Sequence, residues 1–316
     1  MHWKTKATIQ NLISKLPSEL SYAAYYWVQR KFGGLKVLYT LGTLSAAIET
    51  WKTIQLQGVD PANKVFFEVG TGRAALVPLA YWLMGAKKTI TIDLNPYVKA
   101  EIVMEHLNYI VNNKNQINEL FGSLMCEERF EKICKYYKEN NFSDKGYFKL
   151  CHIEYISPGD ASETKLDNMS IDFHTSNAVF EHIPGKVLKN ILLEGNRIIK
   201  ENGIFLHKID YSDHFSHSDK SISAINFLQY SDSQWKKYAG NRYMYMNRLR
   251  HDDFLDLFKE SGHEIISDTP NIDKEVLNLL KSNKVSIDKK FSLKGDNVLS
   301  ITNSWIVSKK VSKTLA

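Results

Sequence analysis

The sequence predicts an α/β protein in which helices cover both faces of a doubly wound, mostly parallel, seven-stranded sheet. The first observation behind this prediction is length, because 316 residues suffice for one large domain with additions or for two modest domains. The second is composition: 43% hydrophobic and 24% charged residues exclude disorder, collagen and coiled coil as descriptions of the whole chain. The third is an alternation of short apolar runs with helical segments, which is typical of parallel strands joined by helices.

Apolar runs bounded by turn residues place the strands, and the 3.6-residue period places the helices. Strands are expected at residues 64–69, 89–93, 148–156, 170–177, 203–209 and 298–307. Helices are expected at residues 77–84, 97–110, 185–200 and 251–261. The first of these helices should begin near Pro78, because proline is tolerated in the first turn of a helix and disfavoured deeper inside it.

The chain divides into a helical N-terminal cap over residues 1–60 and a main domain over residues 61–316. Within the main domain, residues 113–146 are expected to form a polar helical insertion. Residues 210–250 are expected to form a lid, because this long aromatic segment follows the fifth strand at the carboxyl edge of the sheet. Three tyrosines share one helical face of the cap: Tyr22, Tyr25 and Tyr26. We interpret that face as a docking surface for the main domain, with an interfacial membrane helix as the alternative.

Several features argue against export and against a membrane span. The longest apolar run, residues 74–86, has 13 residues and falls short of the ~20 that a bilayer requires. The N-terminal residues do not lead into the continuous apolar segment of a signal peptide. Cys126, Cys134 and Cys151 include no CxxC pair, which disfavours a disulfide framework and a structural zinc site. We therefore expect a cytoplasmic protein with inert thiols.

The net charge of +6 is spread unevenly along the chain. Residues 1–60 hold seven Lys and Arg against three acidic residues, and residues 271–316 hold nine against four. The segment between them carries a net charge of −3. Basic ends on a near-neutral body would suit an anionic substrate or a weak surface association, although solvated lysines are the simpler interpretation.

One motif carries chemistry. Glu68-Val69-Gly70-Thr71-Gly72 closes the first expected strand, and Asp93 closes the next strand, 21 residues after Gly72. Glycines at a strand end let the chain turn tightly and let a ligand approach the backbone. An acid at the tip of the next strand is placed to accept hydrogen bonds from the two ribose hydroxyls of a nucleotide. The pattern therefore predicts an adenosine-containing ligand.

With these residues the sequence resembles the class I S-adenosylmethionine-dependent methyltransferases, over roughly residues 62–210. Further matches follow in the family's order at Thr91-Ile92-Asp93-Leu94-Asn95, Pro158-Gly159-Asp160-Ala161, residues 170–183 and residues 197–203. The resemblance implies S-adenosylmethionine as cofactor, bound by Glu68, Gly70, Thr71, Gly72, Asp93, Leu94, Asp160, Ala161 and Asn177. It implies that Glu68 faces the cationic methionine end and that the turn at Asp160 holds the adenine amino group.

The same motif is also compatible with a second class of protein, the nicotinamide-binding Rossmann oxidoreductases. Gly70-x-Gly72-x-x-Ala75 satisfies the dinucleotide fingerprint, and Asp93 fits its ribose-binding acid. Relative to the methyltransferase pattern, Ala74 replaces a third glycine that is often present, and Arg73 adds a cation. We rank the oxidoreductase second because it explains neither Glu68, nor the Gly-Asp-Ala turn, nor the pair Glu181-His182.

The acceptor would meet the methyl group at the carboxyl ends of the strands. We expect methyl transfer to an oxygen or nitrogen of a small-molecule or glycan-like acceptor, with His182, Asp210 and His214 as candidate catalytic residues. RNA methylation ranks lower, since the sequence shows no RNA-binding module and no Asn-Pro-Pro-Tyr type motif, and a subunit without turnover ranks third.

One run of side chains could in principle bind a metal ion: His207, Asp210, Asp213, His214 and His217. Histidines and carboxylates three to four residues apart can share a helical face. A solvated or substrate-binding loop is the preferred interpretation of this run, so no metal is expected.

Overall fold

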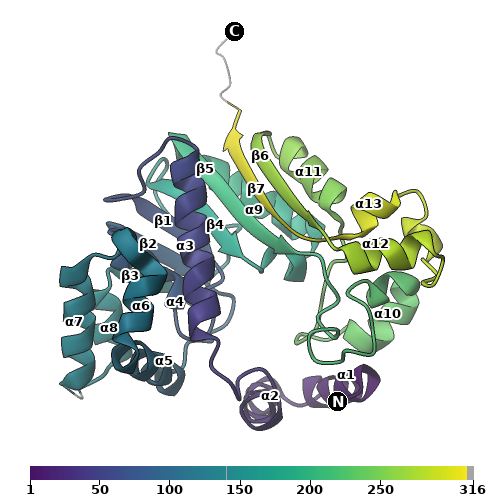
Figure 1. The fold of residues 1–316 in the computed structure, drawn as a ribbon, viewed down its shortest axis with the longest axis horizontal. Coiled ribbons are helices and arrows are strands. Elements are labelled where there is room, and N and C mark those ends of the chain that lie inside the picture. The colour runs from purple at the N-terminus through teal and green to yellow at the C-terminus, as the bar shows by residue number, and fades with distance from the viewer. Residues whose placement is uncertain (140, 312–316) are drawn as a thin grey trace.

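The computed structural model describes residues 1–139 and 141–311, and its centre is one sheet of seven strands (Figure 1). The strands are β1 (Val65–Val69), β2 (Lys88–Ile92), β3 (Ile153–Ile156), β4 (Ile171–Asn177), β5 (Ile199–Asp210), β6 (His263–Ile272) and β7 (Ile301–Lys310). Residue 140 of the expected insertion and residues 312–316 of the expected main domain lie outside the described residues.

The strand order is β3-β2-β1-β4-β5-β7-β6. The pairings from β3 through β5 are all parallel, whereas β7 runs antiparallel to both β5 and β6. The sheet is therefore mixed, with a parallel majority. β1 pairs with β2 on one side and with β4 on the other, so the strand order changes direction at β1. In open α/β sheets, ligands bind at the carboxyl ends of the strands beside such a topological switch point.

Helices cover both faces of the sheet, as predicted. One face carries α3 (Thr40–Leu56), α4 (Leu76–Leu83), α5 (Ala100–Asn112), α6 (Lys114–Phe121), α7 (Glu127–Lys138) and α8 (Asp144–Leu150), with the short η1 (Gly122–Leu124). The other face carries α9 (Gly185–Ile198) and α11 (His251–Glu260). Alternation along β1 sends Phe66 into the first layer and Phe67 into the second. In the first layer, Trp51 of α3 stacks on Phe66 with ring centroids 5.7 Å apart.

A third hydrophobic cluster lies beside the sheet, where the N-terminal helix and residues 276–299 meet the segment after β5 (Figure 1). Its helices are α1 (Trp3–Ser14), η3 (Asn226–Gln229), α10 (Asp232–Ala239), α12 (Lys274–Lys281), η4 (Lys289–Phe291) and α13 (Asp296–Leu299). The backbone N–H of the buried Trp3 donates to Asp219 Oδ2 at 2.8 Å. Residues 210–250 supply buried side chains to this cluster, Phe215, Phe227 and Trp235 among them, so much of the segment is packed structure and its action as a lid stays a prediction.

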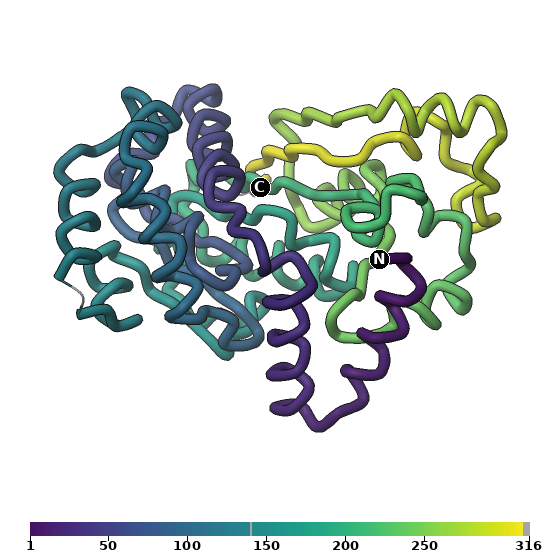
Figure 2. Tube along the Cα trace, turned by 60° about the horizontal axis from the view of Figure 1, so that its bottom comes forward, coloured from purple at the N-terminus to yellow at the C-terminus, as the bar shows by residue number. Residues whose placement is uncertain are grey.

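The cap is a pair of helices, α1 and α2 (Ser18–Phe32), that crosses between the two halves of the molecule (Figure 2). Tyr22 of α2 donates its hydroxyl to Asn95 Oδ1 at 3.1 Å, and Tyr26 donates to Glu101 at 2.7 Å. The aromatic stripe therefore contacts the main domain just after β2. The third helix of residues 1–60, α3, belongs instead to the layer that covers the sheet.

Several strands differ from the sequence-based prediction: β5 begins at Ile199 instead of residue 203, and β7 spans Ile301–Lys310 instead of residues 298–307. The β3 strand begins at Ile153, because residues 148–150 complete α8. No apolar pattern predicts β6, an edge strand that is mostly exposed and polar and that contains Pro270. Proline is tolerated only where no ladder hydrogen bond is needed, which is why an edge strand can hold it. Within the described part of the chain, no helix has the length and apolar character that a membrane crossing requires.

Candidate cofactor and acceptor site

The turn after β1 leaves backbone open to a ligand at Gly72. Gly70 and Gly72 both have positive φ angles, +90° and +70°, which side chains disfavour. A Cβ built on Gly70 would lie 2.5 Å from Val179 Cγ2, so that glycine is required by the protein's own packing. A Cβ on Gly72 would meet no described atom within 4 Å, so the space beside it is free for a ligand.

Asp93 is fixed against this turn. Its Oδ2 accepts a hydrogen bond from the backbone N–H of Thr71 at 3.1 Å, and the Thr71 hydroxyl lies 2.7 Å from the Thr91 hydroxyl. Burial raises the pKa of Asp93 to about 6, although the hydrogen bonds from Thr71 oppose this rise. Leu94, the next residue, is 69% exposed. The structure thus brings the first two predicted motifs together at the carboxyl edge of the sheet.

Glu68 lies beneath the turn. The side chain is 1% exposed and accepts hydrogen bonds from the hydroxyls of Thr175 and of Tyr81, the latter at 3.4 Å. Burial raises the pKa of Glu68 to about 8 despite these two donors. The carboxyl group is therefore largely neutral at pH 7 in the free protein, and a cation brought close to it would favour its ionised form.

The turn after β3 adds Asp160 and Ala161 to the same edge. Gly159 donates its backbone N–H to the carbonyl of Asp93 at 2.9 Å, which joins this turn to the one after β2. Asp160 is exposed, and its Oδ1 accepts from the backbone N–H of Ser162 at 2.8 Å, while Ala161 is buried in the core. Asn177, at the end of β4, is half-buried, and its Nδ2 has no hydrogen-bond partner among the described residues.

The start of α4 is closed to phosphate. Its N-cap residue, Ala75, is fully buried in a left-handed conformation, and the first turn that follows, Leu76, Val77 and Pro78, is also buried. A helix binds phosphate through exposed backbone N–H groups in its first turn. Here those groups are covered, and Pro78 has none to offer.

A second cluster of chemically active side chains lies where β5 ends. Asp210 Oδ2 is 3.3 Å from His214 Nε2 and 3.7 Å from His217 Nε2. Its Oδ1 accepts the backbone N–H of Ser212 at 2.8 Å. Burial alone would raise the pKa of Asp210, but the interactions with His214 and Ser212 outweigh it and lower the pKa to about 2. Asp210 is therefore an anion at neutral pH.

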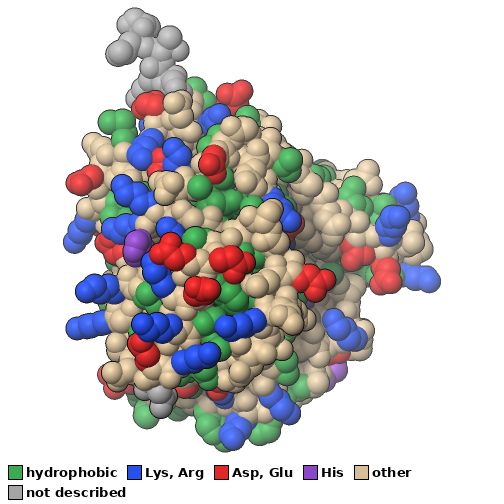
Figure 3. All heavy atoms as spheres, turned by 60° about the vertical axis from the view of Figure 1, so that its left-hand side comes forward, with side chains coloured by type: hydrophobic (Ala, Val, Ile, Leu, Met, Phe, Trp, Pro, Cys, Tyr) green, Lys and Arg blue, Asp and Glu red, His purple; other side chains and the backbone are tan. Residues whose placement is uncertain are grey.

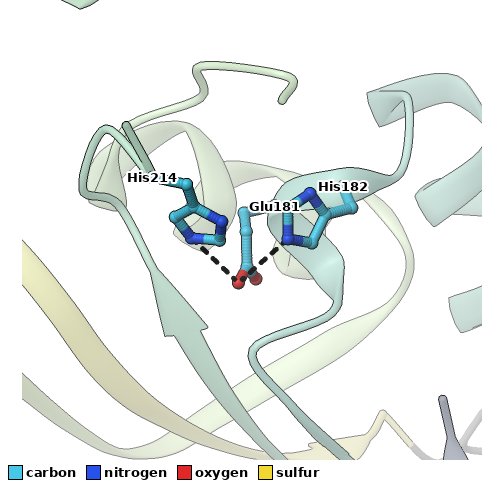
Figure 4. Close-up of side chains that lie close together, drawn as sticks. All are labelled: Glu181, His182 and His214. Atoms are coloured by element: carbon cyan, nitrogen blue, oxygen red, sulfur yellow. Dashed lines mark ion pairs between the residues drawn. The ribbon is translucent and has the colours of Figure 1, made fainter. Parts of the chain in front are cut away.

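Glu181 and His182 join this cluster from η2 (Phe180–His182), which follows β4 (Figure 4). Glu181 Oε1 lies 4.0 Å from His182 Nε2 and 4.0 Å from His214 Nε2. His182 Nδ1 lies 2.9 Å from the backbone carbonyl oxygen of Tyr245. Burial lowers the pKa of His182 to about 4, so its ring is neutral at pH 7. The three predicted catalytic residues, His182, Asp210 and His214, thus meet at one place.

Two members of the run of His and Asp residues between 207 and 217 lie elsewhere. His207 is buried, stacks on Phe180 and contacts the Ser176 hydroxyl through Nδ1 at 2.8 Å. Asp213 is also buried, and it accepts hydrogen bonds from Asn226 Nδ2 and the backbone N–H of Phe215. Alternation along β5 explains His207, because residues 207 and 210 face opposite sides of a strand. Glu181 takes their place in the cluster, although the sequence marked it only as part of a pair with His182.

Next to the cluster is a pocket of about 350 Å³ at the ends of β4, β5 and β7. Its lining mixes polar and apolar groups, and the polar residues include Asn177, Lys208, Asp210, Ser212, His217, Asp273 and Asn303. The pocket therefore links the last predicted cofactor residue, Asn177, to the Asp210 cluster.

No model of a known protein family matches the chain, and no curated protein does either. Among solved structures with a similar fold is a putative sarcosine dimethylglycine methyltransferase from Galdieria sulphuraria. It is 14% identical in sequence, the match covers 84% of this chain and 86% of that one, and the TM-score is 0.46. A geranyl diphosphate C-methyltransferase from Streptomyces coelicolor is 11% identical with a TM-score of 0.46, over 84% and 79%. An S-adenosylmethionine-dependent methyltransferase from Mesorhizobium loti is 9% identical with a TM-score of 0.46, over 84% and 100%. All three are methyltransferases, the class that the sequence motifs resemble.

Proposed function

We propose that the protein is an S-adenosylmethionine-dependent methyltransferase that acts on a hydroxyl or amine of a small, polar, glycan-like acceptor. The observation that carries this proposal is a contrast at one edge of the sheet: an open glycine turn stands next to the acid Asp93, and the helix that follows the turn begins with buried residues. S-adenosylmethionine has a ribose and no phosphate, whereas nicotinamide dinucleotides bind through a pyrophosphate on the helix N-terminus.

The sheet supports the same choice. Dinucleotides commonly bind across two βαβαβ halves in a six-stranded parallel sheet of order 3-2-1-4-5-6. In this protein the second half stops after β5, because antiparallel β7 occupies the next position. One mononucleotide-binding half is complete, which suits a cofactor with a single nucleoside.

Three acidic residues near the glycine turn would each contact a different part of the cofactor. Asp93 would accept hydrogen bonds from the ribose hydroxyls, and Asp160 would accept one from the adenine amino group. Glu68, below the turn, would offset the positive charge of the cofactor's methionine end. Bound there, S-adenosylmethionine supplies an electrophilic methyl group. The protein's task is then to hold the acceptor atom in line with that group and to exclude water.

The cluster at the end of β5 would accept the proton that the acceptor releases. His214 and the anionic Asp210, 3.3 Å apart, form a pair in which the carboxylate stabilises a protonated ring. His182 is the second candidate, with its ring 4.8 Å from that of His214.

The pocket beside the cluster favours an acceptor with several hydroxyl groups. Asn177, Asn303, Ser212 and two carboxylates, those of Asp210 and Asp273, are hydrogen-bonding groups suited to a neutral polyol. Two carboxylates in one pocket disfavour an anionic acceptor, since Lys208, which also lines the pocket, is already paired with Glu49 Oε2 at 2.8 Å.

RNA methylation gains no support from the surface in Figure 3. On this face, Lys and Arg side chains are interspersed with Asp and Glu side chains. Lysines of the described chain also form ion pairs, such as Lys132 with Glu128 at 2.6 Å. A nucleic-acid surface is typically a continuous basic stripe.

Calorimetry separates the two cofactor classes. The untagged protein is titrated with S-adenosylhomocysteine and, separately, with NAD and NADP. We expect saturable binding of S-adenosylhomocysteine alone. Binding of a nicotinamide dinucleotide without binding of S-adenosylhomocysteine would refute the proposal in favour of the oxidoreductase.

A further inference from the structure

Glu181 is a buried carboxyl group that lies close to two histidines, His182 and His214. The residue is 2% exposed, and neither Oε1 nor Oε2 has a hydrogen-bond partner among the described residues. Burying an unpaired carboxylate is costly, so such groups are usually paired with a cation, bound to a metal or kept neutral. The polar groups nearest to Glu181 indicate which of these three states applies.

One neighbour, His182, presents a lone pair to Glu181. The Nδ1 of His182 lies 2.9 Å from the carbonyl oxygen of Tyr245, and a carbonyl can only accept, so Nδ1 carries the proton. The neutral ring then has its lone pair on Nε2, which lies 4.0 Å from Glu181 Oε1. Histidines that bind metals typically donate their other ring N–H to a carbonyl or carboxylate in this way.

The other neighbour, His214, completes the arrangement. Its Nε2 also lies 4.0 Å from Glu181 Oε1, and the three ligand atoms of Glu181, His182 and His214 all lie within 4.8 Å of one another (Figure 4). Ligand atoms around one ion, with bonds of about 2.1 Å, are about 3.4 Å apart in tetrahedral geometry, so small side-chain movements suffice. The histidine side chains are partly exposed, at 37% and 19%, which provides an entry path.

The backbone around Glu181 is fixed in advance. Asn247 donates its side-chain amide to the carbonyls of Phe180 and Ile183, at 2.9 and 2.8 Å, and its backbone N–H to the carbonyl of Glu181 at 2.9 Å. The short helix that carries two of the three ligands is therefore held on both sides by one residue from the segment after α10. Such support around a site keeps its ligands aligned.

We infer that Glu181 Oε1, His182 Nε2 and His214 Nε2 bind one divalent transition-metal ion. Two imidazoles and one carboxylate suit Zn²⁺, Fe²⁺, Co²⁺ or Mn²⁺, whereas Mg²⁺ and Ca²⁺ prefer oxygen ligands alone. Glu181, together with the nearby Asp210, supplies the negative charge that balances the ion. The sequence-based expectation of no metal is revised by this inference.

Metal binding at this site is a property separate from methyl transfer, and it can be measured in the absence of cofactor and acceptor. When the ion is bound, it uses the Nε2 lone pair of His214. Asp210, whose Oδ2 lies 3.3 Å from that nitrogen, then remains beside the ion as a second negative charge, so His214 acts as a proton acceptor only in the ion-free site.

The test uses untagged protein freed of metal by dialysis against a chelator. Titration with Co²⁺ should produce the visible d–d bands of a protein-bound ion at one equivalent, and Zn²⁺ should displace them. Excess Mg²⁺ should leave them unchanged. No Co²⁺ or Zn²⁺ binding by the wild-type protein, or displacement by Mg²⁺, would overturn the inference.

Variants locate the ion. Glu181→Gln and His182→Gln should each weaken Co²⁺ binding at least about 100-fold, more than the loss of an outer partner usually does. His152→Asn, which alters an exposed histidine between α8 and β3, is the matched control and should bind as the wild type does. Unchanged Co²⁺ binding in Glu181→Gln would place the ion elsewhere and overturn the assignment. All variants should retain their affinity for S-adenosylhomocysteine, so a failure of the ion site and a failure of the proposed cofactor are told apart.

Discussion

The carboxylate of Asp93 accepts a hydrogen bond from the backbone N–H of Thr71 across 3.1 Å. This contact joins the turn after β1 to the end of β2, so the acid that is expected to bind ribose is fixed in place before any ligand arrives. A ligand that binds Asp93 therefore spends little free energy on ordering it.

Asp93→Ala should weaken S-adenosylhomocysteine binding by about 1.5–3 kcal/mol, roughly 10- to 100-fold, because hydrogen bonds to a charged group are lost. Calorimetry measures the change directly. Asp256→Ala, at an exposed position of α11, is the control and should bind as the wild type does. Equal affinity in both variants would mean that Asp93 is structural only.

Gly72→Val should abolish cofactor binding and leave the protein folded, because the new side chain would fill the open space beside the turn. Gly58 offers a matched control: its φ is +75° against +70° for Gly72, and a Cβ there also meets nothing within 4 Å. Both valine variants should lose about 1–2 kcal/mol of stability from the left-handed backbone. Only Gly72→Val should lose S-adenosylhomocysteine binding, and a variant that binds normally would show that Gly72 serves the turn alone.

The parallel half of the fold could be predicted from the sequence because its strands are buried on both faces and read as apolar runs. Strand β6 could not, since an exposed edge strand needs no apolar pattern. The site divides in a similar way. The motif at Gly70 and Asp93 follows strand ends, which one sequence reveals, whereas the meeting of Glu181 with His214 depends on the path of the chain after β5.

Glu68 should make stability depend on pH. Burial raises its pKa from 4.5 to about 8 on folding, so between these values the folded protein holds a proton that the unfolded chain releases. Stability contributed by this group is therefore complete below about pH 4.5, falls as the pH rises and is lost above about pH 8.

Glu68→Gln cannot ionise and should be more stable than the wild type at pH 9, by an amount on the order of 2–4 kcal/mol, with a smaller difference at pH 5. Thermal unfolding at the two pH values measures this, and Glu119→Gln, at an exposed position of α6, is the control. A difference between Glu68→Gln and wild type that does not grow with pH would mean that Glu68 is ionised in the fold.

Asp210→Asn and His214→Ala should depress methyl transfer while leaving S-adenosylhomocysteine affinity within about twofold, because neither residue belongs to the glycine turn or to Asp93. Loss of a group that accepts a proton costs 10²–10⁴ in rate, so we expect an effect of about that size. The measurement is release of S-adenosylhomocysteine with a panel of sugars and other polyols as acceptors.

The same assay connects the two proposals. An ion at Glu181, His182 and His214 that helps to hold the acceptor makes two outcomes expected. Removal of metal by a chelator should lower the rate of methyl transfer as much as His214→Ala does. Added Zn²⁺ or Mn²⁺ should then restore the activity of the wild-type protein but not that of the variant. His152→Ala should behave as the wild type under both treatments. Normal turnover in both Asp210→Asn and His214→Ala would move the proton acceptor to His182, or leave proximity between acceptor and methyl group as the main source of catalysis.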